Sequence, residues 1–149
     1  MARMGVMKTP DTLELMKLTA DAVLPTRAHA DDAGLDLYTL GEVTLEPGKC
    51  AVVPTGIAMA IPAGYVGLVA DRSSLARKGI KTAGGVIDAG YRGEIGAVLW
   101  NISREAVTLG RGDRVAQLLL VPVATPAVKE VKSLTDSKRG KGGFGSTGR

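Results

Sequence analysis

The sequence contains few aromatic residues. Phe, Trp and Tyr make up 3% of its 149 residues, whereas hydrophobic residues make up 45%. A core without aromatic bulk has to be built from Val, Leu, Ile and Ala, and the β-branched residues favour strands. Twenty glycines and seven prolines are spread along the chain, so turns are frequent. Many short strands separated by turns indicate a sandwich or barrel, and the length fits one domain.

Cysteine and histidine are nearly absent. A single cysteine, Cys50, excludes a disulfide scaffold and indicates a reducing compartment. Together with the single histidine, His29, it cannot form a His-based zinc site. No apolar run approaches the roughly 18–20 residues of a membrane span, and the first nine residues lack the apolar region of a signal peptide. We therefore expect a cytoplasmic protein that does not contact membranes.

The charge is modest and of mixed sign. Nineteen Lys and Arg against fifteen Asp and Glu give a net charge of +4. This excess suits a small anionic ligand, but it is too diffuse to indicate a nucleic-acid-binding face.

Short apolar segments bounded by turn residues predict about ten strands. One helical turn is expected at residues 73–78, with Ser73 as its N-cap and Gly79 at its end. Residues 85–87 and 91–100 are predicted to pair as a hairpin through the turn at 88–90. An antiparallel, jelly-roll-like β-sandwich or barrel with one short helix fits this pattern best. The main predicted strands are residues 12–18, 35–38, 43–45, 49–53, 57–61, 65–70, 91–100 and 114–123.

The last eleven residues, 139–149, contain five glycines and the only phenylalanine, Phe144. Such a segment cannot pack by itself, so we predict a flexible tail. Phe144 could dock on a neighbour for packing alone. Alternatively, the tail is a lid whose ring stacks on a flat ligand, while neighbouring polar groups meet phosphate oxygens. We therefore divide the chain into a β domain, 1–138, with residues 1–11 expected to be flexible, and a lid, 139–149.

Residues 139–148 read RGKGGFGSTG, which resembles the fifth signature motif of the trimeric dUTP diphosphatase family. The other four motifs occur in order: AGLDLY at 33–38, RSSLARKG at 72–79, GVIDAGYRGE at 85–94 and GDRVAQL at 112–118. The resemblance begins at about residue 13 and covers nearly all of the chain. It implies Mg²⁺-dependent hydrolysis of dUTP to dUMP and pyrophosphate, which limits uracil in DNA and supplies dUMP for thymidylate synthesis.

The resemblance implies that the third motif binds the nucleoside and activates water. Asp88 would be the general base for a water that attacks the α-phosphorus, although alone it is equally typical of a hairpin turn. Tyr91 would pack beneath the deoxyribose and exclude a 2′-hydroxyl; unaided, it fits a half-buried strand residue. The backbone of Gly85, Val86 and Ile87 would bind uracil.

Other motifs would hold the triphosphate. Arg72 and Ser73, with Ser74, begin the helical turn, and a helix N-terminus with a preceding arginine suits an anion. Gln117 would donate to a phosphate oxygen. Asp36 would lie near Mg²⁺, through water or by orienting Arg72. Mg²⁺ keeps several waters and binds mainly to substrate phosphates, so we expect no dedicated metal cage.

The tail residues that the resemblance assigns to the substrate are Arg139, Phe144, Gly145, Ser146 and Thr147. Asp113 and Arg114, in the fourth motif, are expected to be structural.

Three positions depart from the family pattern. A glycine is common where Ser74 stands. Many members have an asparagine near the position of Thr82, and its side-chain amide helps to bind the base. Thr82 cannot copy that geometry. Asp71 replaces a frequent proline and puts a negative charge beside the phosphate site. The sequence offers Arg72 or Lys78 as its partner.

The resemblance also implies a homotrimer with shared active sites. The second and fourth motifs would come from one chain, the uracil hairpin from another and the tail from the third.

A dCTP deaminase, alone or combined with diphosphatase activity, is the nearest alternative because it shares the Arg-Ser-Ser triplet. Its catalytic glutamate would fall near Val98, where no carboxylate stands. A non-catalytic nucleotide-binding module and a structural β-protein are further alternatives. The joint presence of Asp88, Tyr91 and Phe144 argues against loss of catalysis.

Overall fold

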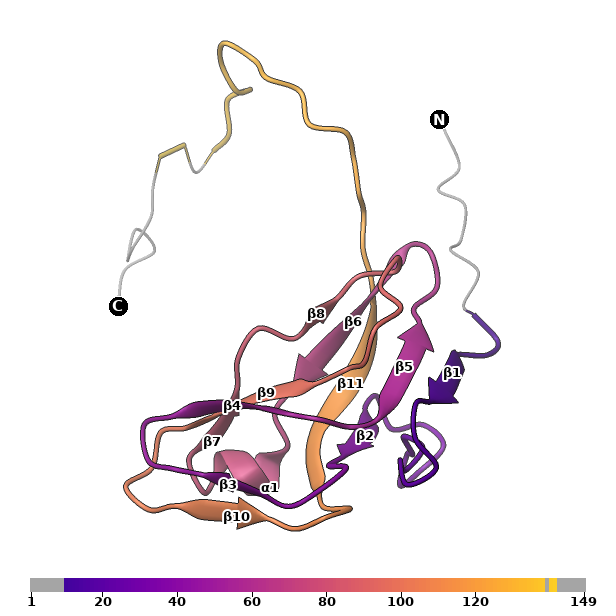
Figure 1. Cartoon of the computed structure of the whole chain (residues 1–149). Coiled ribbons are helices and arrows are strands. Elements are labelled where there is room, and N and C mark those ends of the chain that lie inside the picture. The colour runs from indigo at the N-terminus through magenta and orange to yellow at the C-terminus, as the bar shows by residue number, and fades with distance from the viewer. Residues whose placement is uncertain (1–9, 139, 142–149) are drawn as a thin grey trace.

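The computed structural model describes residues 10–138, 140 and 141. These residues form eleven strands and one short helix (Figure 1). In chain order they are β1 (Glu14–Lys17), β2 (Leu35–Tyr38), β3 (Val43–Leu45), β4 (Cys50–Val53), β5 (Ile57–Ala60), β6 (Tyr65–Ala70), α1 (Ser73–Ala76), β7 (Ile80–Thr82), β8 (Val86–Ile87), β9 (Ala97–Asn101), β10 (Val107–Leu109) and β11 (Arg114–Pro122).

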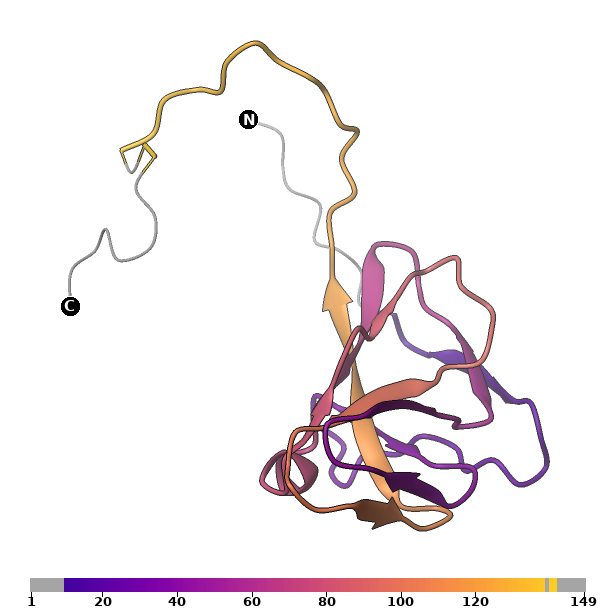
Figure 2. The same ribbon diagram turned by 60° about the vertical axis from the view of Figure 1, so that its left-hand side comes forward.

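All strand pairs are antiparallel, and most neighbours are distant in sequence. The sheets have the orders β1-β5, β10-β3, β2-β11-β6-β8 and β4-β9-β7. The nine-residue strand β11 lies between β2 and β6, so it connects an early strand of the sequence with one from the middle of the sequence. Figures 1 and 2 show these sheets curling around one interior. The all-β, jelly-roll-like fold is confirmed.

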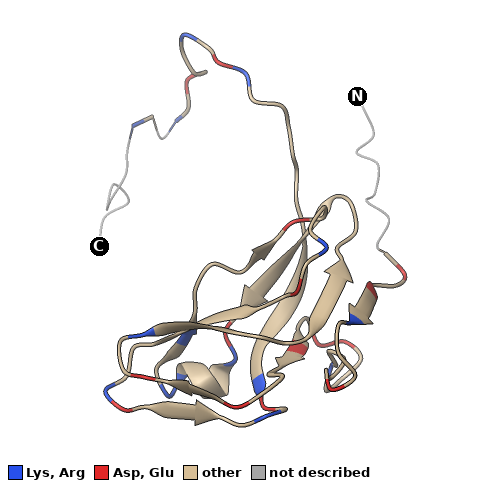
Figure 3. Ribbon diagram, in the orientation of Figure 1, with Lys and Arg blue, Asp and Glu red and all other residues tan. Residues whose placement is uncertain are grey.

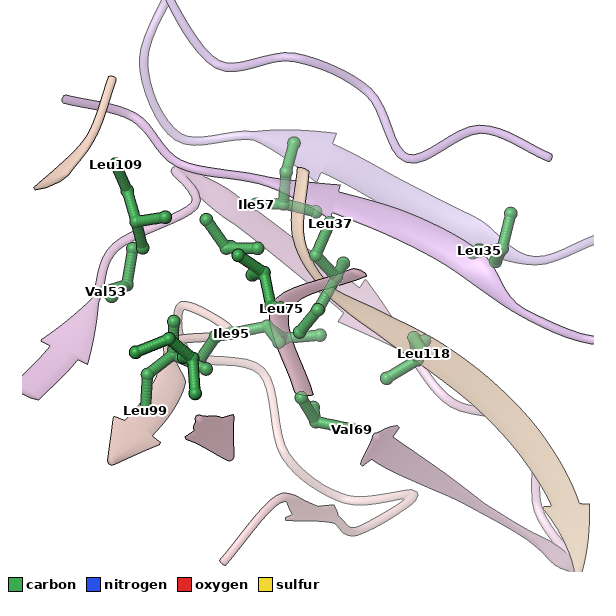
Figure 4. Packing of buried hydrophobic residues seen from close by; sticks show 14 of the residues in the cluster. Leu35, Leu37, Val53, Ile57, Val69, Leu75, Ile95, Leu99, Leu109 and Leu118 are labelled. Atoms are coloured by element: carbon green, nitrogen blue, oxygen red, sulfur yellow. The ribbon is translucent and has the colours of Figure 1, made fainter. Parts of the chain in front are cut away.

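The core is aliphatic, as the scarcity of aromatic residues predicts. Its buried cluster consists of Leu, Ile, Val and Ala residues with one Met. In β2, burial alternates, so Leu35 and Leu37 face the interior while Asp36 and Tyr38 do not. Leu118 of β11 is fully buried and lies in the same cluster (Figure 4). This alternation places the polar residues of β2 and β11 on the outer face, where the site lies.

Several sequence predictions match the structure. Strands β2, β3 and β6 have the predicted bounds. The predicted helical turn is present, and Gly79 (φ +79°) directs the chain from it into β7. The prediction that Ser73 is the N-cap is wrong. Arg72 holds that position, in extended conformation, and its carbonyl accepts from Ala76 at 2.9 Å. Strands β7 and β10 were not predicted.

The predicted hairpin between residues 85–87 and 91–100 is wrong. β8 pairs with β6, whereas β9 pairs with β4 and β7. Gly84 (φ +67°) and Gly85 (φ +90°) turn the chain away from the sheet of β7. The Gly85 carbonyl then accepts from Val69 of β6 at 2.8 Å. A Cβ at Gly85 would lie 2.8 Å from the Val69 carbonyl oxygen, so this close approach requires glycine.

Beyond β11 the chain leaves the barrel. The Val123 amide donates to the Gly64 carbonyl at 2.9 Å, and the following residues extend outward (Figures 1 and 2). Val128 and Leu134 on this segment are 100% and 87% exposed. The boundary at residue 138 stays a prediction. Within the described residues, no helix is long and apolar enough to cross a membrane.

Candidate active site

The outer face of β2 and β11 and the start of α1 line an open cavity of about 470 Å³. It gathers five residues that the sequence predicts to bind phosphate or metal. The lining residues are Ala28, Asp32, Ala33, Gly34, Asp36, Arg72, Ser73, Ser74, Arg114 and Gln117. The first, second and fourth motifs, far apart in sequence, therefore share one cavity.

Strand register explains why these motifs meet. Gln117 lies opposite Asp36 of β2 and opposite Ala70 of β6. The β11–β2 register shifts between Arg114 and Ala116. Residues three apart on a regular strand point to opposite faces, but an extra residue resets that alternation. The irregularity therefore allows both Arg114 and Gln117 to line the cavity.

Asp36 holds two arginines in the cavity. Arg72 Nε donates to its Oδ1 at 2.9 Å, and Arg114 Nη1 donates to its Oδ2 at 3.3 Å. The Asp36 side chain is 16% exposed, so these pairs are partly shielded from water. The structure thus shows Asp36 orienting Arg72, one of the two roles anticipated for it. It also places Arg114, expected to be structural, on the cavity wall, because the register shift in β11 allows its side chain to share a face with that of Gln117.

The carboxylates of this cavity suit Mg²⁺ only as an ion held by phosphates and water. Both Asp36 oxygens already accept from guanidinium groups. Asp32 Oδ2 accepts from the His29 amide at 2.9 Å. Among the described residues, no three His, Cys, Asp or Glu side chains form a metal-binding group. Such a donor set fits a hard cation that keeps much of its water shell.

Asp71 does not pair with Arg72 or Lys78; that expectation is wrong. Its Oδ1 accepts from the Thr82 amide at 2.6 Å and hydroxyl at 2.8 Å, and its Oδ2 pairs with the Lys81 ammonium. Burial alone would raise the pKa of Asp71, but Lys81 and the two Thr82 donors outweigh it and lower that pKa. Two of the positions that depart from the family pattern, Asp71 and Thr82, therefore bind each other, and Lys81 compensates the negative charge within the chain.

Gln117 is also fixed by its neighbours. Its Nε2 donates to the Asp71 carbonyl at 2.7 Å. A Cβ at Gly34 would collide with its side-chain amide, so the glycine of the first motif leaves room for it. Asp113, as expected, is structural: its Oδ2 accepts from the Gly110 amide at 2.8 Å and closes the turn before β11.

The loop between β8 and β9 carries the predicted base and sugar-binding residues. Asp88 is exposed and begins a turn in which its carbonyl accepts from the Tyr91 amide at 3.0 Å. Tyr91 is 44% exposed, and its hydroxyl donates to the Glu94 carbonyl at 2.9 Å. Arg92 Nη1 donates to the carbonyls of Ala89 at 2.7 Å and Tyr91 at 2.8 Å. Hydrogen bonds to the backbone carbonyls of the loop, most of them from the Tyr91 and Arg92 side chains, thus give this surface loop a defined shape.

This loop and the cavity lie at opposite ends of the barrel. In both views the β8–β9 loop lies away from α1, next to the turn that joins β5 to β6 (Figures 1 and 2). Its Ile95 amide donates to the Ile57 carbonyl of β5 at 2.8 Å. Asp88 and Tyr91 are not among the residues that line the described cavity, and neither is the segment 85–87. One chain thus holds the predicted site in two separate halves.

The structure describes none of the five tail residues that are assigned to the substrate. Arg139, Phe144, Gly145, Ser146 and Thr147 lie outside the described residues. Over the described part, Figure 3 shows acidic and basic residues interspersed on the ribbon, in agreement with the modest net charge.

Comparison with known proteins identifies the family. The sequence profile of the dUTPase family matches residues 20–148. The deoxyuridine 5′-triphosphate nucleotidohydrolase of Mycolicibacterium gilvum is 49% identical over 146 residues, which cover 92% of this chain and 95% of the relative. The enzyme of the same name from Mus musculus is 44% identical over 139 residues, covering 93% of this chain and 86% of the relative.

Solved structures agree with the sequence relatives. The dUTPase of Staphylococcus bacteriophage 80alpha, solved with dUPNHPP, has a TM-score of 0.88 and 34% identity, covering 94% of this chain and 100% of that chain. A mutant dUTPase from phage phi11 of S. aureus, whose structure describes the coordination of a structural Mg(II) ion, has a TM-score of 0.77 and 33% identity, covering 83% and 98%. The chain belongs to the dUTPase family.

Proposed function

We propose that this chain hydrolyses dUTP to dUMP and pyrophosphate. The family match over residues 20–148 carries this proposal, and the cavity adds chemistry of the right kind. The cavity is open and polar, and it presents two guanidinium groups, two serine hydroxyls and an amide. These are donors that suit a chain of phosphate oxygens.

The cavity would hold the triphosphate. Arg72 is aimed by Asp36, and Gln117 by the Asp71 carbonyl. Held side chains lose little freedom when a ligand binds, so they can position phosphates for an in-line displacement. Phosphoryl transfer requires mainly such positioning together with neutralisation of charge on the phosphate oxygens. Ser73 and Ser74 are exposed at the start of α1 and can donate to the same oxygens.

Asp88 would act as the general base. Its exposed carboxylate accepts a proton from a water whose oxygen forms a bond to the α-phosphorus. The bond from the α-phosphorus to the oxygen that bridges to the β-phosphorus breaks, and pyrophosphate leaves with that oxygen. Tyr91 would lie beneath the deoxyribose and exclude the 2′-hydroxyl of UTP. Backbone groups of residues 85–87 would bind uracil.

Mg²⁺ is the proposed cofactor. It would neutralise phosphate charge while held by the substrate and water, with Asp36 acting through water or through Arg72. The phage phi11 enzyme is described with a structural Mg(II) ion, and the carboxylates of the cavity fit an indirect role.

We propose a homotrimer with shared active sites. Two features of the single chain support it: the cavity and the β8–β9 loop lie at opposite ends of the barrel, and residues after β11 extend away with Val128 and Leu134 exposed. A cyclic arrangement can bring one chain's cavity to another chain's loop. The third chain would contribute the glycine-rich lid, in which Phe144 stacks on the base and Arg139, Gly145, Ser146 and Thr147 meet the phosphates.

The setting of the reaction is also a proposal. We place the protein in the cytoplasm, without nucleic acid or membrane as a partner. There its activity would limit uracil in DNA and supply dUMP for thymidylate synthesis.

A substrate panel tests the function. Pyrophosphate release from dUTP, UTP, dTTP and dCTP should be measured with and without Mg²⁺, together with ammonia release from dCTP. We expect rapid turnover of dUTP alone and strong stimulation by Mg²⁺. Ammonia from dCTP would instead support the deaminase, and equal turnover of UTP would remove the role of Tyr91.

A further inference from the structure

The ring of Tyr91 lies against Gly93, and we propose that Gly93 and Glu94 are positioning residues that determine specificity by setting where this ring lies. The inference rests on the proposed function, in which Tyr91 excludes a 2′-hydroxyl. A residue that excludes a single hydroxyl has to be held at a defined height beneath the sugar. The structure shows what holds it.

A side chain at Gly93 would overlap the hydroxyl end of the Tyr91 ring. A Cβ at Gly93 would lie 2.5 Å from Oη of Tyr91, 2.7 Å from its Cζ and 3.0 Å from its Cε2. Non-bonded carbon atoms normally approach to about 3.5–4.0 Å, so any side chain at this position must displace the ring. Gly93 is not among the glycines with positive φ. The contact with the Tyr91 ring, rather than the backbone conformation, therefore opposes a side chain here, and the ring has to shift to admit one.

Glu94 ties the outer end of the ring to the barrel. Its carbonyl accepts from the Tyr91 hydroxyl at 2.9 Å. Its own carboxylate accepts from the buried Gly56 amide at 2.7 Å, and its backbone bridges to Ala58 of β5. Because Tyr91 is 44% exposed, burial alone does not fix the ring. The hydroxyl end of the ring thus lies against Gly93 and is hydrogen-bonded to the carbonyl of Glu94.

The Asp88 turn is held separately. Arg92 binds the carbonyls of Ala89 and Tyr91, and the Tyr91 amide donates to the Asp88 carbonyl. None of these bonds involves the Tyr91 ring. A side chain at Gly93 should therefore move the ring while the backbone that carries the general base keeps its shape. Discrimination between dUTP and UTP should change more than the chemical step does.

The experiment compares Gly93→Ala with Gly90→Ala, a matched change in the same loop. A Cβ at Gly90 meets nothing within 4 Å, and Gly90 is not among the glycines with positive φ. Values of kcat/KM for dUTP and UTP should be measured for both variants and the unaltered protein. We expect the dUTP-to-UTP ratio to fall at least about tenfold in Gly93→Ala, the scale of one misplaced contact in a binding pocket, and to stay within about twofold in Gly90→Ala.

Tyr91→Phe provides a second test, since it keeps the ring but removes the hydrogen bond to Glu94. We expect the ratio to fall about threefold, because the loss of one neutral hydrogen bond has that order of effect. Circular dichroism and thermal melting establish that each variant is folded. An unchanged ratio in folded Gly93→Ala would overturn the proposal. If that variant does not fold, an unchanged ratio in Tyr91→Phe would do so.

The unaltered protein separates this inference from the proposed function. If it fails to hydrolyse dUTP, or hydrolyses UTP equally well, the function proposed above is wrong. If it discriminates normally and only the variants behave contrary to expectation, the fault lies with the role assigned to Gly93 and Glu94.

Discussion

The two ends of the barrel present their polar groups in different ways. At the α1 end, Asp36 pairs with Arg72 and Arg114, and Gln117 is held by the Asp71 carbonyl. At the β8–β9 end, hydrogen bonds to backbone carbonyls shape the loop, and Asp88 on it is exposed. Among the described residues, none forms an ion pair with Asp88.

This difference matches the two tasks proposed for the two ends, which are phosphate binding at the α1 end and proton acceptance at the β8–β9 end. Side chains that bind phosphate must be held in a defined orientation and keep their positive charge. The Asp36 carboxylate orients two such side chains, Arg72 and Arg114. A general base must keep its lone pairs available to water, and an exposed carboxylate does so. In the proposed mechanism each end supplies half of an active site, and the proposed assembly brings the halves together.

Asp88→Asn tests the exposed half and should have the largest effect. Loss of the proton acceptor should lower kcat by about 10²–10⁴-fold, while binding of a non-hydrolysable dUTP analogue, followed by calorimetry, should persist. Asp21→Asn is the control, because Asp21 is 69% exposed and forms a surface pair with Arg111. Normal turnover of the Asp88→Asn variant would show that Asp88 is not the general base.

Deletion of residues 139–149 tests the proposed lid. The truncated protein should keep its oligomeric state and melting temperature but lose about 10²-fold or more in kcat/KM, because an open site positions the triphosphate poorly. Light scattering checks the assembly, and pyrophosphate release checks the rate. Unchanged turnover would show that the two halves suffice without the tail.

Asp36→Asn tests the paired half. The change removes the charge that holds both arginines, so Arg72 should lose its orientation. We expect KM for dUTP to rise about tenfold, with a smaller change in kcat. Unfolding should become easier by about 1.5–3 kcal/mol, the scale of hydrogen bonds to charged groups. If KM stays unchanged, Arg72 does not depend on Asp36 for its position.

The sequence predicts features that depend on neighbouring residues better than features that depend on residues far apart in the chain. Short segments bounded by turn residues predict β2 and β6 with their bounds, because turn residues that end a strand act locally. The hairpin prediction fails because Gly84 and Gly85 redirect the chain towards β6. No local pattern indicates that approach.

In the candidate site, too, contacts between residues far apart in the chain could not be predicted from the sequence. Motifs identify Asp36, Arg72 and Gln117, and the fold brings them together. The pairing of Asp71 with Thr82 and Lys81 was missed because only tertiary structure sets it. Arg114 was assigned a structural role because its place on the wall depends on an irregularity in β11.

Asp71→Asn should have the smallest effect. The lowered pKa of Asp71 means that its stabilising effect is present above the carboxyl's unfolded pKa of about 3.9 and is lost as pH falls through the folded pKa. At neutral pH the variant should unfold more easily by at most about 1 kcal/mol, since the Lys81 pair is partly exposed. Urea unfolding should show this difference shrinking in acid. A difference that grows in acid would contradict the ion pair.

Mixing two inactive variants tests the divided site most directly. Asp88→Asn chains supply intact cavities and Arg72→Ala chains supply intact loops, so neither variant alone should hydrolyse dUTP appreciably. After equal amounts are unfolded and refolded together, about one site in four should receive both intact halves if neighbouring chains share sites in a ring. The account predicts recovery to about a quarter of the activity of the unaltered protein treated in the same way. No recovery above the separately refolded variants would contradict it.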